Sequence, residues 1–207
     1  MTAGTVDFTL PASETELEAV AARLRERNFE VVIVQSSADV KAAVMGRIPE
    51  GATVHSGKSK TLEEAGLFKE LMESERYDFI RRRTSKLDRK TQGDEIRKLG
   101  AAPDFMLGSV QAVTESGQLV VASASGSQIG PYASGAGKLI LVIGSQKIVP
   151  DVDTALRRIN EHVFPYEDAR LRETIGVGTK LTRWLVIEQD YYPGRTTIIL
   201  VRESTGV

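Results

Sequence analysis

Cysteine is absent from this 207-residue chain. Without a thiol, the chain has no disulfide, no thiolate zinc site, no cysteine-held iron–sulfur cluster and no catalytic cysteine. Histidine is scarce too: His55 and His162 lie far apart and have no metal-ligand spacing around them. The composition therefore disfavours a histidine metal centre or a histidine-dependent triad, and we expect no cofactor.

Neither an excess of one charge nor a long hydrophobic run is present. The chain has 27 Lys and Arg against 28 Asp and Glu, a formal net charge of −1, which does not predict nucleic-acid binding. The longest apolar stretch, residues 139–143, is far too short to span a bilayer. Residues 1–10 lack the basic start and apolar centre of a signal peptide, so we expect a cytoplasmic protein.

What is present is an alternation of helical and strand patterns. Apolar periodicity predicts helices over 13–28, 38–45, 62–72, 151–163 and 167–173, with Pro165 ending the fourth, and strands over 29–34, 52–55, 77–82, 105–114, 119–123, 139–144, 184–187 and 196–201. This order predicts an α/β fold with an open, mixed, mostly parallel sheet, helices on both faces and an antiparallel part. No linker or repeat divides residues 1–207, which predicts one domain; the polar, basic segment 76–103 is a candidate surface insertion.

A turn of small residues, Gly57-Lys58-Ser59-Lys60-Thr61, follows a predicted strand. It is not a phosphate loop, because five residues separate Gly51 from Gly57, whereas that motif has four between its first glycine and Gly-Lys-Ser/Thr. Two interpretations stay open. Ser59 or Thr61 caps the next helix, or Gly57, Lys58, Ser59 and Thr61 bind an anion at the helix start.

Glu115 lies in the turn Thr114-Glu115-Ser116-Gly117 between two predicted strands. In one interpretation this is a solvated hairpin turn in which Gly117 supplies a positive φ angle. In the other, Glu115 projects into a crevice at the strand ends and acts as nucleophile or general base, with Gly117 beside the ligand. The second interpretation makes Glu115 the candidate catalytic residue.

Two further candidates follow later strands. Gly126, Ser127 and Gln128 form either a tight loop or a ligand-binding loop, in which glycine lets the backbone approach and the side chains supply donors and acceptors. Lys147 is either a surface lysine or the cation that faces an acidic ligand. If the loops around residues 57, 115 and 126 meet at one sheet edge, they enclose a site for a small anion.

These motifs resemble the LUD-domain family, the lactate-utilisation proteins. The resemblance rests on Asp104, Val54–Leu62, Ser109–Gly117, Gly126–Gln128, Gln146–Asp151, Arg157–Ile159, Pro165, Glu167 and Pro193–Glu203, and it extends over nearly the whole chain. It implies a fold like that of the sugar-phosphate isomerase and coenzyme A transferase superfamily, and a role near the oxidation of lactate to pyruvate. In the related transferases a glutamate in a Glu-x-Gly turn is the nucleophile, and Glu115 stands in the matching place.

The missing cysteines separate this chain from many members of that family, which carry cysteines near the C-terminal region. The resemblance therefore implies a non-redox accessory that binds a small anionic ligand and works beside iron–sulfur proteins of lactate oxidation, with a homo-oligomer as a further option. The alternative is a free-standing enzyme, transferase-like or isomerase-like, that uses Glu115. A third hypothesis is a ligand sensor without chemistry, which leaves open whether the chain is an enzyme.

Overall fold

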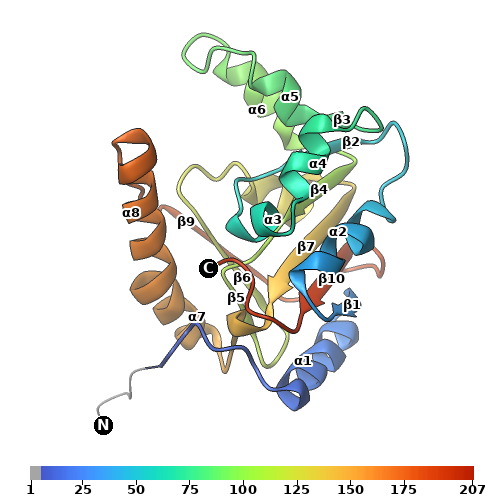
Figure 1. Ribbon diagram of the computed structural model, residues 1–207, viewed down its shortest axis with the longest axis vertical. Helices are drawn as coiled ribbons and strands as arrows, with labels where there is room; N and C mark the ends of the chain where they lie inside the picture. The colour runs from blue at the N-terminus through green and yellow to red at the C-terminus, as the bar shows by residue number, and fades with distance from the viewer. Residues whose placement is uncertain (1–5) are drawn as a thin grey trace.

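The larger of two sheets is parallel throughout (Figure 1). The computed structural model describes residues 6–207, and in this part of the chain the strand order is β1–β10–β7–β4–β2–β3. The strands are β1 (Glu30–Val34), β2 (Thr53–Ser56), β3 (Asp78–Phe79), β4 (Phe105–Gly108), β7 (Lys138–Gly144) and β10 (Thr196–Val201). Strands β7 and β10 are near-continuous runs of Val, Ile and Leu because both of their faces are buried.

The smaller sheet supplies the antiparallel part. Its order is β8–β5–β6–β9, and the strands are β5 (Ala112–Thr114), β6 (Leu119–Ser123), β8 (Ile148–Val149) and β9 (Arg183–Ile187). Strand β6 is antiparallel to β5 and β9, whereas β8 is parallel to β5. Val113 and Val121 share a core cluster with Leu141 of the larger sheet, so the two sheets pack against each other. The predicted open α/β fold is confirmed.

Helices cover the remaining faces. Helix α1 (Glu14–Glu26) begins with the Ser13–Glu16 capping box and packs into the cluster between the sheets. Helices α2 (Ser37–Met45), α3 (Lys60–Glu64) and α4 (Leu67–Glu73) cover the other face of the larger sheet. Helix α7 (Val152–Arg158) packs on the outer face of the smaller sheet and continues through the π-helical turn η3 (Ile159–Val163) into α8 (Phe164–Ile175), which stands at the side of the molecule in Figure 1.

Several predicted elements were wrong in their extent. The single strand predicted over 105–114 is two strands in different sheets, because the chain leaves the larger sheet after Gly108. The helix predicted over 62–72 is broken between α3 and α4, where Gly66 adopts a φ of 68°. Pro165 does not end a helix but lies in the first turn of α8, directly after the π-helical turn η3.

The segment 76–103, a candidate insertion, contributes to the core at its start. The strand predicted over 77–82 is reduced to β3, and α5 (Ile80–Thr84) follows directly. Tyr77 and Phe79 are buried in the cluster beneath α4, whereas α6 (Gly93–Ala101) has no buried residue. No helix among residues 6–207 is both long enough and apolar enough to cross a bilayer.

Candidate functional site

The carboxyl ends of β2, β4 and β7 meet at one edge of the parallel sheet, which is where α/β folds bind ligands. After β7 the chain makes a short 3-10 turn, η2 (Ser145–Lys147), which turns Lys147 inward. Lys147 is only 2% exposed. Its Nζ donates to Thr61 Oγ1 at 2.9 Å and to Ser109 Oγ at 3.0 Å. The side chains that follow three strands are thus brought together.

The two hydroxyl groups act as acceptors for this lysine. Thr61 donates its proton to Ser109 Oγ at 3.4 Å, and Ser109 donates its own to the Val110 carbonyl at 3.3 Å. Tyr132 holds the Ser109 backbone in place: its hydroxyl accepts from the Ser109 N–H and donates to the Ser109 carbonyl, both at 3.2 Å. The polar atoms around Nζ are therefore in a defined arrangement.

Replacing Gly108 with alanine should destabilise the protein. An added Cβ would collide with the Tyr132 hydroxyl, and this side chain is buried and cannot move away. Overpacking of this kind costs about 1–3 kcal/mol, measured as a drop in the free energy of unfolding in urea. Gly93→Ala is the matched control, because a Cβ there meets nothing and lies in a helix. An equal effect of both substitutions would contradict the packing described.

Lys147 lies in an environment with excess positive charge. Burial and, to a lesser degree, the charge of Arg158 lower the pKa of Lys147 to about 7, and Glu64 acts in the opposite direction. Arg158 is fully buried, and burial lowers its pKa to about 10. Its guanidinium donates to the Gln111 carbonyl at 2.6 Å and to the Phe8 carbonyl at 3.4 Å. Among residues 6–207, neither cation has a carboxylate within ion-pair distance.

The segment after β10 covers this cluster. The Gln146 side chain pairs with the backbone of Thr205, donating to its carbonyl at 3.0 Å and accepting from its N–H at 3.2 Å. Gly206 donates its N–H to Glu64 Oε2 at 2.6 Å and packs directly on Thr61 Oγ1, where no Cβ would fit. In Figure 1 the C-terminal end accordingly lies beside α3. Residues 204–206, called the tail below, close the site from outside.

Unpaired polar groups lie at the same sheet edge. The hydroxyl oxygens of Ser56, the last residue of β2, and of Thr205 are buried and have no hydrogen-bond partner within residues 6–207. Arg81 Nη1 donates to the Ser56 carbonyl at 3.2 Å, and burial lowers the pKa of Arg81. Burial and the charge of Arg81 together lower the pKa of His55 to about 4, so this imidazole is neutral at physiological pH.

Two of the three predicted loops do meet. A Cβ on Gly57 would lie 3.0 Å from Gln128 Oε1, so the loops after β2 and β6 are in contact. Ser59 is the N-cap of α3 and accepts from the Leu62 N–H at 3.4 Å, which agrees with the capping interpretation for this residue. Lys58 is exposed.

The other predicted loop residues lie nearer the surface. Gly126 has a φ of 77° and packs against the Arg183 side chain. The Ser127 hydroxyl accepts from Ser125 at 3.1 Å. Both contacts stay within this loop and the neighbouring strand β9, outside the cluster around Lys147.

The Glu115 turn makes its contacts elsewhere. Glu115 is exposed, and its backbone N–H donates to the Val149 carbonyl at 2.8 Å. Gly117 has a φ of 88° and packs on the end of α1, where Arg27 Nε donates to the Ser116 carbonyl at 2.6 Å. Among the described residues, no hydrogen bond joins this turn to Gly57, Gln128 or Lys147, and the geometry is that of a solvated hairpin turn.

Sequence reasoning missed Ser109, Tyr132 and Arg158 as members of the site. Arg158 lies beside Arg157 on a predicted helix, and nothing in the sequence distinguishes the buried arginine from the exposed one. Ser109 follows an apolar run, which is the signal that a strand ends there. To place Ser109 in the site from the sequence, one would have had to recognise that the chain between Gly108 and Gln111 passes from one sheet to the other.

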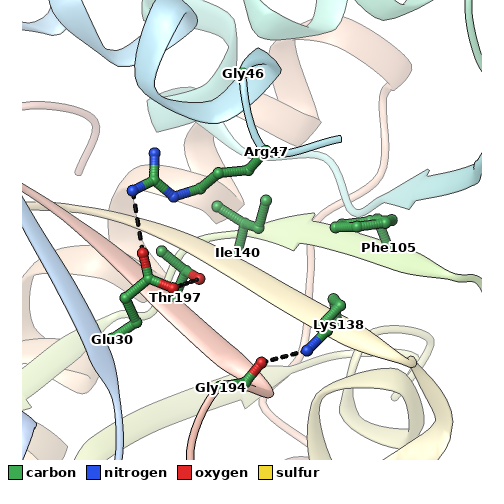
Figure 2. A pocket seen from close by; sticks show the side chains of 8 residues that line it. All are labelled: Glu30, Gly46, Arg47, Phe105, Lys138, Ile140, Gly194 and Thr197. Atoms are coloured by element: carbon green, nitrogen blue, oxygen red, sulfur yellow. Dashed lines mark hydrogen bonds and ion pairs between the residues drawn. The ribbon is translucent and has the colours of Figure 1, made fainter. Parts of the chain in front are cut away.

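A groove of about 440 Å³ lies at the opposite edge of the sheet (Figure 2). Its charged groups are already engaged: Arg47 pairs with Glu30 at 3.1 Å, and Lys138 donates to the Gly194 carbonyl at 2.5 Å. Glu30 also accepts from the Thr197 hydroxyl at 3.2 Å. These bonds leave little charge for a ligand. Within residues 6–207 there is also no group of three or more His, Asp or Glu side chains suited to a metal ion.

Residues 17–201 match the family model of the LUD domain. The chain belongs to the LUD-domain family. The crystal structure of a DUF162 family protein from Deinococcus radiodurans is similar to this LUD domain, with a TM-score of 0.50 and 15% sequence identity, over 92% of this chain and 99% of that one. This likeness concerns the fold alone. No curated protein matches the chain. The family match includes Thr61, Ser109 and Lys147 and ends before the tail.

Proposed function

We propose that this LUD-domain protein binds a small organic anion at the Lys147–Thr61–Ser109 cluster, as a non-redox accessory in the utilisation of lactate or other organic acids. The observation that carries the proposal is a buried lysine amino group that has hydroxyl partners but no carboxylate partner among the described residues. Arg158 adds a second buried positive charge.

A buried positive charge favours a ligand of opposite charge. Removing an ammonium group from water costs several kcal/mol unless an opposite charge compensates. A ligand carboxylate would supply that charge, and its attraction is stronger in a buried site than in water. Binding an anion would also raise the pKa of Lys147, so we expect proton uptake on binding and weaker binding above pH 8.

The accessory role follows from what this chain can and cannot carry. It has no cysteine and therefore holds no cysteine-ligated iron–sulfur cluster, so the partner we propose for a lactate oxidation is an iron–sulfur protein. The enzyme alternative, in which Glu115 is a nucleophile, stays a prediction. It requires a substrate to reach an exposed turn.

Thermal-shift measurements with lactate, pyruvate, acyl-coenzyme A and sugar phosphates test this proposal. A ligand at a hundred times its dissociation constant adds roughly 2.7 kcal/mol to the stability of the folded state. We expect a carboxylate ligand to stabilise the wild type and to lose this effect in Lys147→Met. Lys58→Ala and Glu115→Ala are controls and should respond like the wild type.

Two results would count against the anion site. Loss of the response in Glu115→Ala, with Lys147→Met unaffected, would favour the enzyme that uses Glu115. A wild type that responds to none of the carboxylates would leave the proposal without support, since the buried charge would then be balanced in another way.

A further inference from the structure

The hydrogen bonds of Lys147 match an amine better than an ammonium group. An ammonium has three N–H donors, whereas a neutral amine has two and a lone pair. Nζ has two acceptors among the described residues, Thr61 Oγ1 at 2.9 Å and Ser109 Oγ at 3.0 Å. The third N–H of an ammonium would be buried without a partner, which is unfavourable. In the neutral form the third position is a lone pair, which can act as a nucleophile toward a carbonyl group.

We infer, on the basis of the anion site proposed above, that Lys147 reacts with carbonyl groups and forms an imine with a 2-oxo acid. The carboxylate of such a ligand would find unsatisfied positive charge nearby. Arg158 Nε is buried and has no hydrogen-bond partner among the described residues, and the charge of this arginine lowers the pKa of Lys147. The same ligand thus uses both side chains, the neutral amine of Lys147 as nucleophile and the guanidinium group of Arg158 as counter-charge.

The reaction balances without a further reactant. The Nζ lone pair attacks the keto carbon, a C–N bond forms, and the carbonyl oxygen takes up one amine proton to give a carbinolamine. Loss of water then breaks the C–O bond and leaves the imine, so both amine protons depart with the oxygen. In the folded protein each of these N–H groups faces a hydroxyl, of Thr61 and of Ser109, which can carry the proton.

Burial also makes Lys147 more reactive toward carbonyl groups than other lysines of the chain. A pKa of about 7 leaves about half of Lys147 neutral at pH 7. An ordinary lysine, with a pKa of about 10.4, has a neutral fraction roughly a thousandfold smaller at this pH. Access is governed by the tail, because Thr205 and Gly206 lie over Thr61 and are held by Gln146 and Glu64.

Reductive trapping tests the inference. The full chain is incubated at pH 7 with pyruvate and cyanoborohydride, which reduces an imine to a stable amine, and the product is mapped by peptide mass spectrometry. We expect Lys147 to gain the mass of the acid less one oxygen atom. The yield at Lys147 should exceed that at the exposed Lys58 by at least about tenfold, because its neutral fraction is larger. Acetone, a ketone without a carboxylate, should label Lys147 less.

Two variants distinguish the reactivity of Lys147 from the access of the ligand to it. Lys147→Arg should abolish the adduct, whereas Gln146→Ala, which releases Thr205, should form it faster than the wild type. The inference is overturned if neither the wild type nor Gln146→Ala gains an adduct at Lys147, or if labelling follows surface exposure alone. Carboxylate stabilisation without any adduct would refute the imine and leave the anion site intact, whereas absence of both would refute the two together.

Discussion

Between pH 7 and pH 9 the wild-type protein should gain roughly 2–3 kcal/mol of stability relative to Lys147→Met, since each unit of pKa difference corresponds to about 1.4 kcal/mol. The pKa of Lys147 is lowered from 10.5 to about 7 in the folded protein. Between these two values the unfolded chain binds a proton that the folded protein does not, so the free energy of unfolding rises with pH. Below pH 7 both states are protonated, and this gain is absent.

Urea denaturation of both proteins at pH 6, 7, 8 and 9 measures the difference. At pH 6 we expect Lys147→Met to be at least as stable as the wild type, because an apolar side chain of similar length avoids burying a cation. The hydroxyls of Thr61 and Ser109 keep acceptors of their own after the substitution. Parallel stability curves for the two proteins would contradict a lowered pKa at this position.

Other buried groups do not interfere in this pH range. Burial lowers the pKa of His55 to about 4, so its contribution changes below pH 6.5. Burial raises the pKa of Tyr132, and its stabilising effect is lost only as the pH rises above 10. The lowered pKa of Arg158 likewise acts above pH 10. The difference between wild type and Lys147→Met therefore reports on the lysine.

Arg158→Met should destabilise the protein by about 2–4 kcal/mol, because two carbonyls lose a donor and each buried group left without a partner costs about 1–3 kcal/mol. Arg158 connects the smaller sheet to the N-terminal segment by donating to the carbonyls of Gln111 and Phe8. Methionine fills much of the space but cannot donate to either carbonyl. Urea denaturation at pH 7 measures the loss.

Arg157→Met is the matched control for this experiment. Arg157 is the preceding residue on the same helix, but it is partly exposed and pairs with Glu161 at 3.2 Å. Exposed pairs of this kind contribute about 0–1 kcal/mol. Equal losses for the two arginines would contradict the buried role of Arg158. Removing the charge of Arg158 should also raise the pKa of Lys147, which would move the pH dependence described above to higher pH.

The elements that sequence reasoning predicted well are those with a local cause. The β-branched runs of β7 and β10 form buried strands, and Ser13 and Glu16 form the predicted capping box, because each depends on neighbouring residues alone. The buried strand expected over 29–34 is instead the partly buried edge strand β1. The predicted α/β fold and the predicted family are also confirmed. Both predictions depended on strand and helix patterns and motifs of consecutive residues. The single strand expected over 105–114 was wrong because periodicity does not show that a chain changes sheets at Gly108.

The sequence by itself determined the fold class, the family and the candidate lysine, because strand patterns and motifs are properties of consecutive residues. Only the tertiary structure decided which side chains surround that lysine. Thr61 and Lys147 are separated by 86 positions in the chain, and burial of Lys147 and Arg158 depends on how two sheets and a tail pack. Desolvation and contacts between distant segments set the charge of Lys147 and leave Glu115 in water, and neither is encoded in a local pattern.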